Sequence, residues 1–163
     1  AGTVNLNILA NGISAFTRDI SMGGNQFTEE IQKQLNVSFE EAEALKIGGG
    51  NTADADSVVP QEVERVIQSV SSNMAAELQR SIDFYTATTA DSHIARVYLA
   101  GGTAKIPTLL RVLESRLGIP VELMNPFRNV EVDRSQFDPD YIQDIAPIAG
   151  ISVGLGVRRE GDK

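Results

Sequence analysis

Alternating apolar and polar positions near the start of the chain, followed by a turn signal, predict a β-hairpin. Leu6 and Ile8 alternate with Asn5 and Asn7 in the two-residue period of a half-buried strand, and residues 13–20 resume as a second strand. Between them, Asn11-Gly12 is the pair best suited to a two-residue hairpin turn, because both residues accept a positive φ angle. We therefore expect two antiparallel strands joined at this turn.

Apolar residues at spacings of four then predict a short amphipathic helix. Phe27, Ile31 and Leu35 carry this pattern, and the helix follows the glycine-rich start Gly23-Gly24-Asn25. A second helix is predicted by Ser38-Phe39-Glu40-Glu41, which fits a capping box. In a capping box, the serine oxygen accepts from an amide of the first turn and the glutamate reaches back to the serine amide.

The longest predicted helix begins at Pro60, after the glycine-rich and polar segment 48–57, which is typical of a mobile surface loop. Glu62 and Glu64 stand near its start, where the helix dipole favours acidic side chains. One apolar stripe runs along it and consists of Val63, Val66, Ile67, Val70, Met74, Leu78 and Ile82. We interpret the stripe as a face packed on a sheet; a surface that binds a partner is the alternative.

A strand, a glycine turn, a helix and a second strand follow in that order. Residues 94–100 are mostly apolar and are interpreted as a largely buried strand. After Gly101-Gly102, a helix is predicted over 107–117 and a short strand over 121–124. Because a strand, helix, strand unit of this kind joins parallel strands, we expect a parallel pair.

The last part of the chain changes from polar to apolar. Residues 128–140 are polar and irregular, whereas 145–157 are small and apolar almost throughout. The small side chains of Ala146, Ala149, Gly150 and Gly154 would let a helix backbone lie close to its neighbour, so we expect a tightly packed core helix. This segment is too short to span a hydrocarbon core of about 30 Å.

Composition limits the possible partners. The 163 residues are 42% hydrophobic and 22% charged, as in an ordinary globular domain. A net charge of −8 and a pI near 4.6 argue against nucleic acid or an anionic lipid surface as a direct partner. There is no cysteine for a disulfide or a thiolate metal site, and His93 is the only histidine. We therefore expect a surface or packing role for His93 rather than a catalytic or metal cluster.

Three short segments carry candidate binding chemistry. Glycines let a ligand approach the backbone, so Gly101-Gly102-Thr103 fits a nucleotide; a purely steric turn is the alternative. Glu43 and Lys46 project from one helical face, where a carboxylate can accept from ribose hydroxyls and a lysine stem can cover a base; an exposed ion pair is the alternative. Gly2 and Thr3 offer an N–H group and a hydroxyl to a phosphate.

Eight segments share an order and a spacing that point to one family. They are residues 5–9, 16–20, 23–24, 28–31, 42–46, 101–107, 125–127 and 154–159. In this order they resemble the second half of an actin-like ATPase, the superfamily that includes actin, the DnaK-type chaperones, sugar kinases and FtsA. The Asn-Leu-Asn strand at 5–7 and the Asn-Pro-Phe at 125–127 are most similar to the PilM family of type IV pilus assembly.

The resemblance implies an α/β fold, the actin-like (ribonuclease H-like) ATPase half. It predicts a mixed sheet that opens with a β-hairpin, flanking helices and a small helical insertion. Residues 1–24 would form the first part of subdomain IIA, 25–88 a helical insertion resembling subdomain IIB with its return helix, and 89–163 the second part of subdomain IIA. The chain begins inside a strand pattern, so we also expect it to be part of a larger two-domain protein.

For function, the resemblance implies ATP, with Mg²⁺ beside it in the intact protein. It also implies a cytoplasmic scaffold at the inner-membrane face of a bacterium, which links the PilN tail to the pilus motor. The implied site has Gly2 and Thr3 at the phosphates, Glu43 and Lys46 at the ribose or base, and Gly101, Gly102 and Thr103 at the adenosine. We expect binding, with at most weak ATPase activity in the intact protein and no catalytic residue in this chain.

Three departures from the family pattern limit the expected activity. The aspartate and glycine expected shortly before Ala1 are not in the sequence, Val4 stands where threonine is usual, and the first half with its own phosphate loop is missing. Because phosphoryl transfer needs groups on all sides of the γ-phosphate, half a cleft should not hydrolyse ATP at a useful rate. A catalytic phosphotransferase such as a sugar kinase, and a partner-binding module without nucleotide, are the alternatives.

Overall fold

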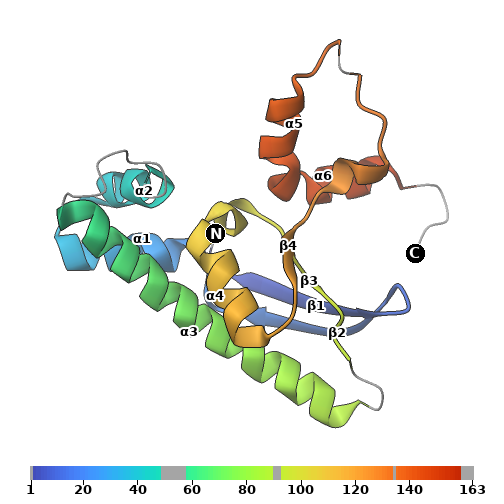
Figure 1. Ribbon diagram of the computed structural model, residues 1–163, viewed down its shortest axis with the longest axis horizontal. Helices are drawn as coiled ribbons and strands as arrows, with labels where there is room; N and C mark the ends of the chain where they lie inside the picture. Colours follow the sequence, from blue (N-terminus) through green and yellow to red (C-terminus); the bar gives the residue numbers. More distant parts are fainter. Residues whose placement is uncertain (1, 49–57, 90–92, 134, 159–163) are drawn as a thin grey trace.

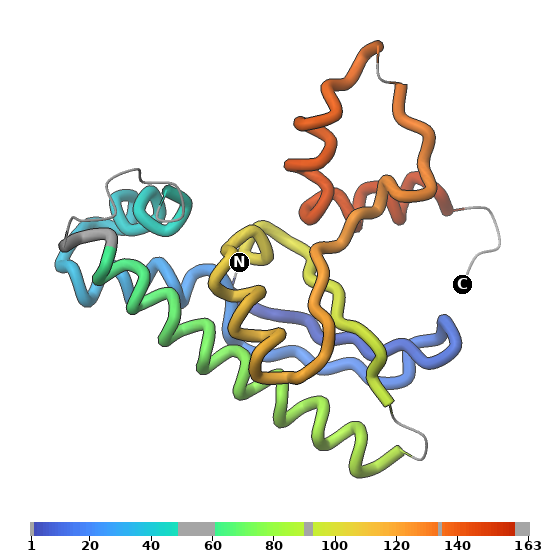
Figure 2. The backbone as a smooth tube through the Cα atoms, viewed as in Figure 1, coloured from blue at the N-terminus to red at the C-terminus, as the bar shows by residue number. Residues whose placement is uncertain are grey.

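The computed structural model describes residues 2–48, 58–89, 93–133 and 135–158 (Figure 1). In chain order its elements are β1 (Val4–Ala10), β2 (Ile13–Ile20), α1 (Gly24–Leu35), α2 (Phe39–Gly48), α3 (Val58–Thr88), β3 (Val97–Leu99), η1 (Gly102–Lys105), α4 (Pro107–Leu117), β4 (Val121–Leu123), η2 (Pro126–Asn129), α5 (Pro139–Ile145), η3 (Ala146–Ile148) and α6 (Gly150–Gly156). Figure 2 shows a body that contains the hairpin and the long helix α3, and a smaller lobe formed by the C-terminal helices.

The hairpin forms where the sequence predicted it. Asn11 and Gly12 have φ angles of 53° and 79°, as a tight two-residue turn requires. β1 and β2 pair antiparallel with Val4 opposite Ile20. The side chains of Ile8 and Ile20 are buried, so the hairpin contributes its inner face to the core.

The long helix α3 carries most of the core. Every residue of the predicted apolar stripe is at most 7% exposed. Phe27 and Ile31 of α1 and Leu113 of α4 belong to the same cluster, while Tyr85 of α3 places its ring 5.9 Å from that of Phe16 in β2. Burial of each such side chain contributes about 1.5–3 kcal/mol. The stripe is therefore core, and α1 and α4 cover it together with the hairpin.

β3 and β4 pair in parallel, as predicted, with Val97 opposite Val121. In the described residues the strands form one antiparallel and one parallel pair, and no backbone ladder joins the pairs into one sheet. The prediction of a largely buried strand over 94–100 is wrong. β3 has only three residues, and Tyr98 is 54% exposed because only Val97 and Leu99 pack toward the core.

The C-terminal apolar segment does not form the predicted core helix. Ala146 and Pro147 are buried, but the side chains of Ile151 and Leu155 are 80% and 62% exposed. Pro147 has no N–H group to continue a helix and stands inside η3, and the segment is divided into the short helices η3 and α6. In Figure 1, α6 lies with α5 in the smaller lobe, away from α3. The apolar residues of α6 are therefore surface residues.

Three smaller predictions concern the loops and the ends of helices. α3 begins at Val58, so Pro60 stands in its first turn, where the missing N–H group costs little. His93 is exposed, as expected. Of the loop predicted over 48–57, Gly48 ends α2, and residues 49–57 lie outside the described residues. Within the described part of the chain, the helices are too short or too polar to cross a membrane.

Candidate functional site

The capping box predicted from the sequence holds the start of α2. The amide of Ser38 donates to Oε2 of Glu41 at 2.9 Å, and the amide of Glu41 donates to Oγ of Ser38 at 3.2 Å. These bonds satisfy N–H groups that the start of a helix leaves unpaired. In the following turns, α2 directs Glu43 and Lys46 toward α1.

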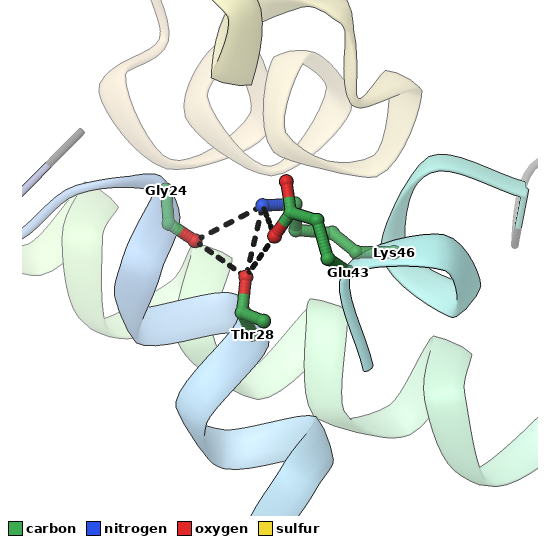
Figure 3. A network of polar contacts seen from close by, with 4 residues as sticks. All are labelled: Gly24, Thr28, Glu43 and Lys46. Carbon is green, nitrogen blue, oxygen red and sulfur yellow. Dashed lines mark hydrogen bonds and ion pairs between the residues drawn. The ribbon is translucent and has the colours of Figure 1, made fainter. Parts of the chain in front are cut away.

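Glu43 and Lys46 form a polar network with the first turns of α1 (Figure 3). Nζ of Lys46 lies 2.5 Å from Oε2 of Glu43, and it donates to Oγ1 of Thr28 at 2.9 Å and to the carbonyl oxygen of Gly24 at 3.4 Å. The hydroxyl of Thr28 donates to the same Oε2 at 2.5 Å. An ammonium group has three protons, so these contacts use every donor of Lys46.

Among the residues that the structure describes, only one oxygen of the Glu43 carboxylate, Oε2, has a hydrogen-bond partner. The hydrogen bond from Lys46, followed by the one from Thr28, lowers the pKa of Glu43 below its ordinary value of 4.5, so the group is ionised at neutral pH. Both bonds reach Oε2, and Figure 3 draws the other oxygen pointing away from α1. The Glu43 side chain is 37% exposed, whereas that of Lys46 is 12% exposed. The pair is thus anchored and half-buried, unlike a free surface ion pair.

Sequence reasoning missed Thr28 and Gly24. Thr28 is fully buried, and it meets Glu43 only because α1 packs against α2. No local pattern links two positions on different helices. The nearest signal in the sequence was the glycine-rich helix start at Gly23-Gly24, whose buried backbone supplies the carbonyl that Lys46 contacts.

The turn after β3 is shaped by Gly101. Its φ and ψ angles are 97° and 169°, a conformation that is open almost only to glycine. Its N–H group donates to the carbonyl of Pro147 at 2.7 Å, and its carbonyl accepts from the amide of Ala104 at 3.2 Å. The steric interpretation of the glycine pair is therefore correct for this first glycine.

Gly102 has no such structural reason to be glycine. Its φ angle lies outside the positive range, and a Cβ atom there would meet no atom within 4 Å. Gly102 is exposed and Thr103 beside it is half-buried. The described residues therefore leave open space at this position, as a ligand lying against the backbone would need.

Gly2 and Thr3 are exposed and stand directly before β1. Because Val4 pairs with Ile20, this segment leaves the hairpin at the end from which the chain continues to Gly24 and α1. A Cβ atom at Gly2 would meet no atom within 4 Å. Val4 packs half-buried against the core, which accounts for an apolar residue at that position.

Within the described residues, the segment 43–46 is the one of the three predicted segments whose side chains bond to each other (Figure 3). Among the described residues, no hydrogen bond or ion pair joins the segments 2–3, 43–46 and 101–103. The structure thus brings Glu43 and Lys46 together. It leaves Gly2, Thr3 and Gly102 exposed, and the other two, Gly101 and Thr103, half-buried.

A separate hollow of about 840 Å³ lies in the C-terminal part of the chain. Its lining includes Phe127, Val130 and Phe137, together with the acidic residues Glu131 and Asp133. It contains none of the seven predicted site residues, and its two carboxylates would repel a phosphate. In the described part of the chain, no three or more His, Cys, Asp or Glu side chains gather into a group that could hold a metal ion.

Comparison with known proteins matches this chain to a family and to solved structures that include a PilM-PilN complex and the protein EutJ. Residues 1–160 match the family model described as type IV pilus assembly protein PilM. A solved PilM-PilN type IV pilus biogenesis complex matches with a TM-score of 0.81 and 27% identity, over 96% of this chain and 43% of that chain. The ethanolamine utilization protein EutJ from Carboxydothermus hydrogenoformans matches with a TM-score of 0.66 and 21% identity, over 96% of this chain and 45% of that chain.

These likenesses confirm the predicted fold class. The fold is that of an actin-like ATPase, an α/β architecture with a hairpin and flanking helices. The chain spans less than half the length of each solved chain that it matches.

Proposed function

The chain belongs to the PilM family of type IV pilus assembly proteins, and we propose that it is the nucleotide-binding half of such a protein. In this proposal, bound ATP supports a scaffold role in pilus assembly, and rapid hydrolysis is not part of the function. Support comes from the ionised, anchored Glu43 carboxylate and from the open backbone at Gly102.

The arrangement of Glu43 carries the proposal. A ribose offers hydroxyl donors without charge, and these suit an ionised carboxylate that has one free oxygen. A phosphate does not suit it, because two negative groups repel each other. We therefore assign the ribose to Glu43. Lys46, whose donors are all used, contributes its charge and its apolar stem.

The remaining predicted site residues are assigned to the adenosine and to the phosphates, the two ends of the nucleotide. In this assignment, Gly101 shapes the turn, Gly102 and Thr103 lie against the adenosine, and Gly2 and Thr3 bind the phosphates. Mg²⁺ would accompany the phosphates and neutralise part of their charge, held by groups outside the described residues.

The partner and the domain organisation are also proposals. The PilM chain in the solved complex is bound to PilN, and we assign a PilN partner to the full-length protein at the cytoplasmic face of the inner membrane. We assign no PilN contact to residues of this chain. Residues 1–24 and 89–163 are assigned to subdomain IIA, and 25–88 to subdomain IIB with its return helix.

Calorimetric titration of the full-length protein with Mg-ATP tests the nucleotide proposal. Gly102→Val places two methyl groups in the open space, and we expect it to abolish binding without lowering the melting temperature. Glu43→Gln should weaken binding about tenfold, because the amide oxygen that replaces the carboxylate is uncharged and accepts a weaker hydrogen bond from the ribose. Gly154→Val is the matched control, since a Cβ atom there also meets nothing within 4 Å. The proposal is ruled out if the protein without substitutions does not bind Mg-ATP. It is also ruled out if Gly102→Val and Glu43→Gln both bind Mg-ATP normally.

A further inference from the structure

The hydroxyl of Thr28 connects the two helices of the candidate site. Thr28 stands on α1 and is fully buried, and its hydroxyl donates to Glu43 at 2.5 Å and accepts from Lys46 at 2.9 Å. Both of these partners belong to α2 (Figure 3). Among the described residues, no other side chain bonds to both members of the pair.

We propose that Thr28 is a positioning residue for the nucleotide site, which holds the carboxylate of Glu43 so that Oε1 is presented to the ribose. This inference rests on the proposed function of Glu43 and extends it to a residue that need not touch the ligand. The function of the site then depends on how α1 packs against α2.

The geometry explains why the ion pair alone would not suffice. Glu43 and Lys46 lie on the same helix, and Lys46 reaches α1 through the carbonyl of Gly24 at 3.4 Å as well as through Thr28. Among the described residues, the carboxylate of Glu43 bonds to α1 only through Thr28, whose short side chain is a fixed point on that second helix. Thr28 and Lys46 both donate to Oε2 of Glu43, and these two bonds fix the orientation of the planar carboxylate. The other oxygen, Oε1, therefore points in one direction.

Thr28 also affects the charge of the site without any ligand present. Its hydrogen bond is the second cause, after that of Lys46, that lowers the pKa of Glu43. Removal of the hydroxyl should therefore raise the pKa of Glu43 toward 4.5. This readout distinguishes a role in positioning the carboxylate from a general role in packing.

The test compares Thr28→Val with Thr28→Ser in the full-length protein. Valine keeps the shape of threonine and removes the hydroxyl, whereas serine keeps the hydroxyl. We expect Thr28→Val to weaken Mg-ATP binding about tenfold in calorimetry, as for one lost hydrogen bond to a charged group, and Thr28→Ser to restore it. In the protein without nucleotide, NMR titration of labelled glutamate side chains should show a raised Glu43 pKa in Thr28→Val only.

Thr108→Val is the matched control. Thr108 is also buried, donates to the carboxylate of Glu64 at 2.7 Å and accepts from Arg111 at 3.0 Å, but this trio lies between α3 and α4. The same chemical change is thus made outside the network of Glu43. We expect nucleotide affinity and the Glu43 pKa to stay as in the unchanged protein.

Each outcome bears on one of the two proposals. Normal binding and a normal Glu43 pKa in Thr28→Val overturn the role of Thr28, whereas an unchanged protein that fails to bind Mg-ATP overturns the nucleotide site itself. If Thr28→Val and Thr108→Val weaken Mg-ATP binding equally, the positioning role is also overturned, because lost packing then explains the loss of affinity in both variants. If Thr28→Val does not fold, Thr28→Ala gives the same comparison with Thr28→Ser.

Discussion

The backbone N–H of Gly101 donates to the carbonyl of Pro147 at 2.7 Å, and this bond ties the turn after β3 to the C-terminal lobe. It also separates the roles of two neighbouring glycines. Gly101 has a conformation that other residues rarely adopt, whereas Gly102 has an ordinary φ angle and open space around it. The backbone conformation therefore requires glycine at position 101. It does not require glycine at position 102, where a side chain would find open space.

Alanine substitution should separate these two roles in the protein without nucleotide. Gly101→Ala should lower the free energy of unfolding by about 1–3 kcal/mol, because alanine is strained at a φ of 97°. Gly102→Ala should change it by less than about 0.5 kcal/mol, since the added Cβ atom meets nothing. Urea denaturation of both variants measures the difference. Equal losses would mean that Gly102 is also a structural glycine.

The charge of Glu43 predicts a pH dependence of stability. Its pKa in the folded protein is lowered, chiefly by Lys46, so its contribution is fully present above the ordinary value of 4.5 and is lost as the pH falls through the lowered value. The unchanged protein should exceed Glu43→Gln in unfolding free energy by a constant amount from pH 7 to 5, and the difference should shrink in more acidic solution. Urea denaturation at a series of pH values measures it. A difference that grows as the pH falls would contradict the ionised network.

The capping box at Ser38 should stabilise the start of α2, the helix that carries Glu43 and Lys46. Ser38→Ala removes the oxygen that accepts from the amide of Glu41, and it should cost about 0.5–2 kcal/mol. The amides of the first turn of α2 should then exchange faster with solvent in hydrogen-exchange measurements. Ser72→Ala is the control, because Ser72 is a half-buried residue inside α3 whose hydroxyl donates to the carbonyl of Gln68 in the same helix. Slower or unchanged exchange in Ser38→Ala would show that the cap does not hold α2.

Local chemistry explains which parts of the fold the sequence could predict. The hairpin turn at Asn11-Gly12 and the capping box at Ser38 depend on residues within four positions of each other, and both formed as predicted. The exposure of α6 and the contact of Thr28 with Glu43 depend on what packs against a segment. Apolar composition over 145–157 indicates a tendency to be buried, but it does not specify the partner that would bury the segment.

Truncation of a core residue and of a surface residue of similar size should change the free energy of unfolding by very different amounts. Leu113 of α4 and Ile151 of α6 are such a pair. Leu113 of α4 is 1% exposed, so Leu113→Ala should lower the free energy of unfolding by about 2–5 kcal/mol, through lost burial and the cavity left behind. Ile151 of α6 is 80% exposed, so Ile151→Ala should cost less than about 0.5 kcal/mol. Urea denaturation of the 163-residue chain measures both values. A cost of several kcal/mol at Ile151 would show that α6 packs into a core after all, as its composition first indicated.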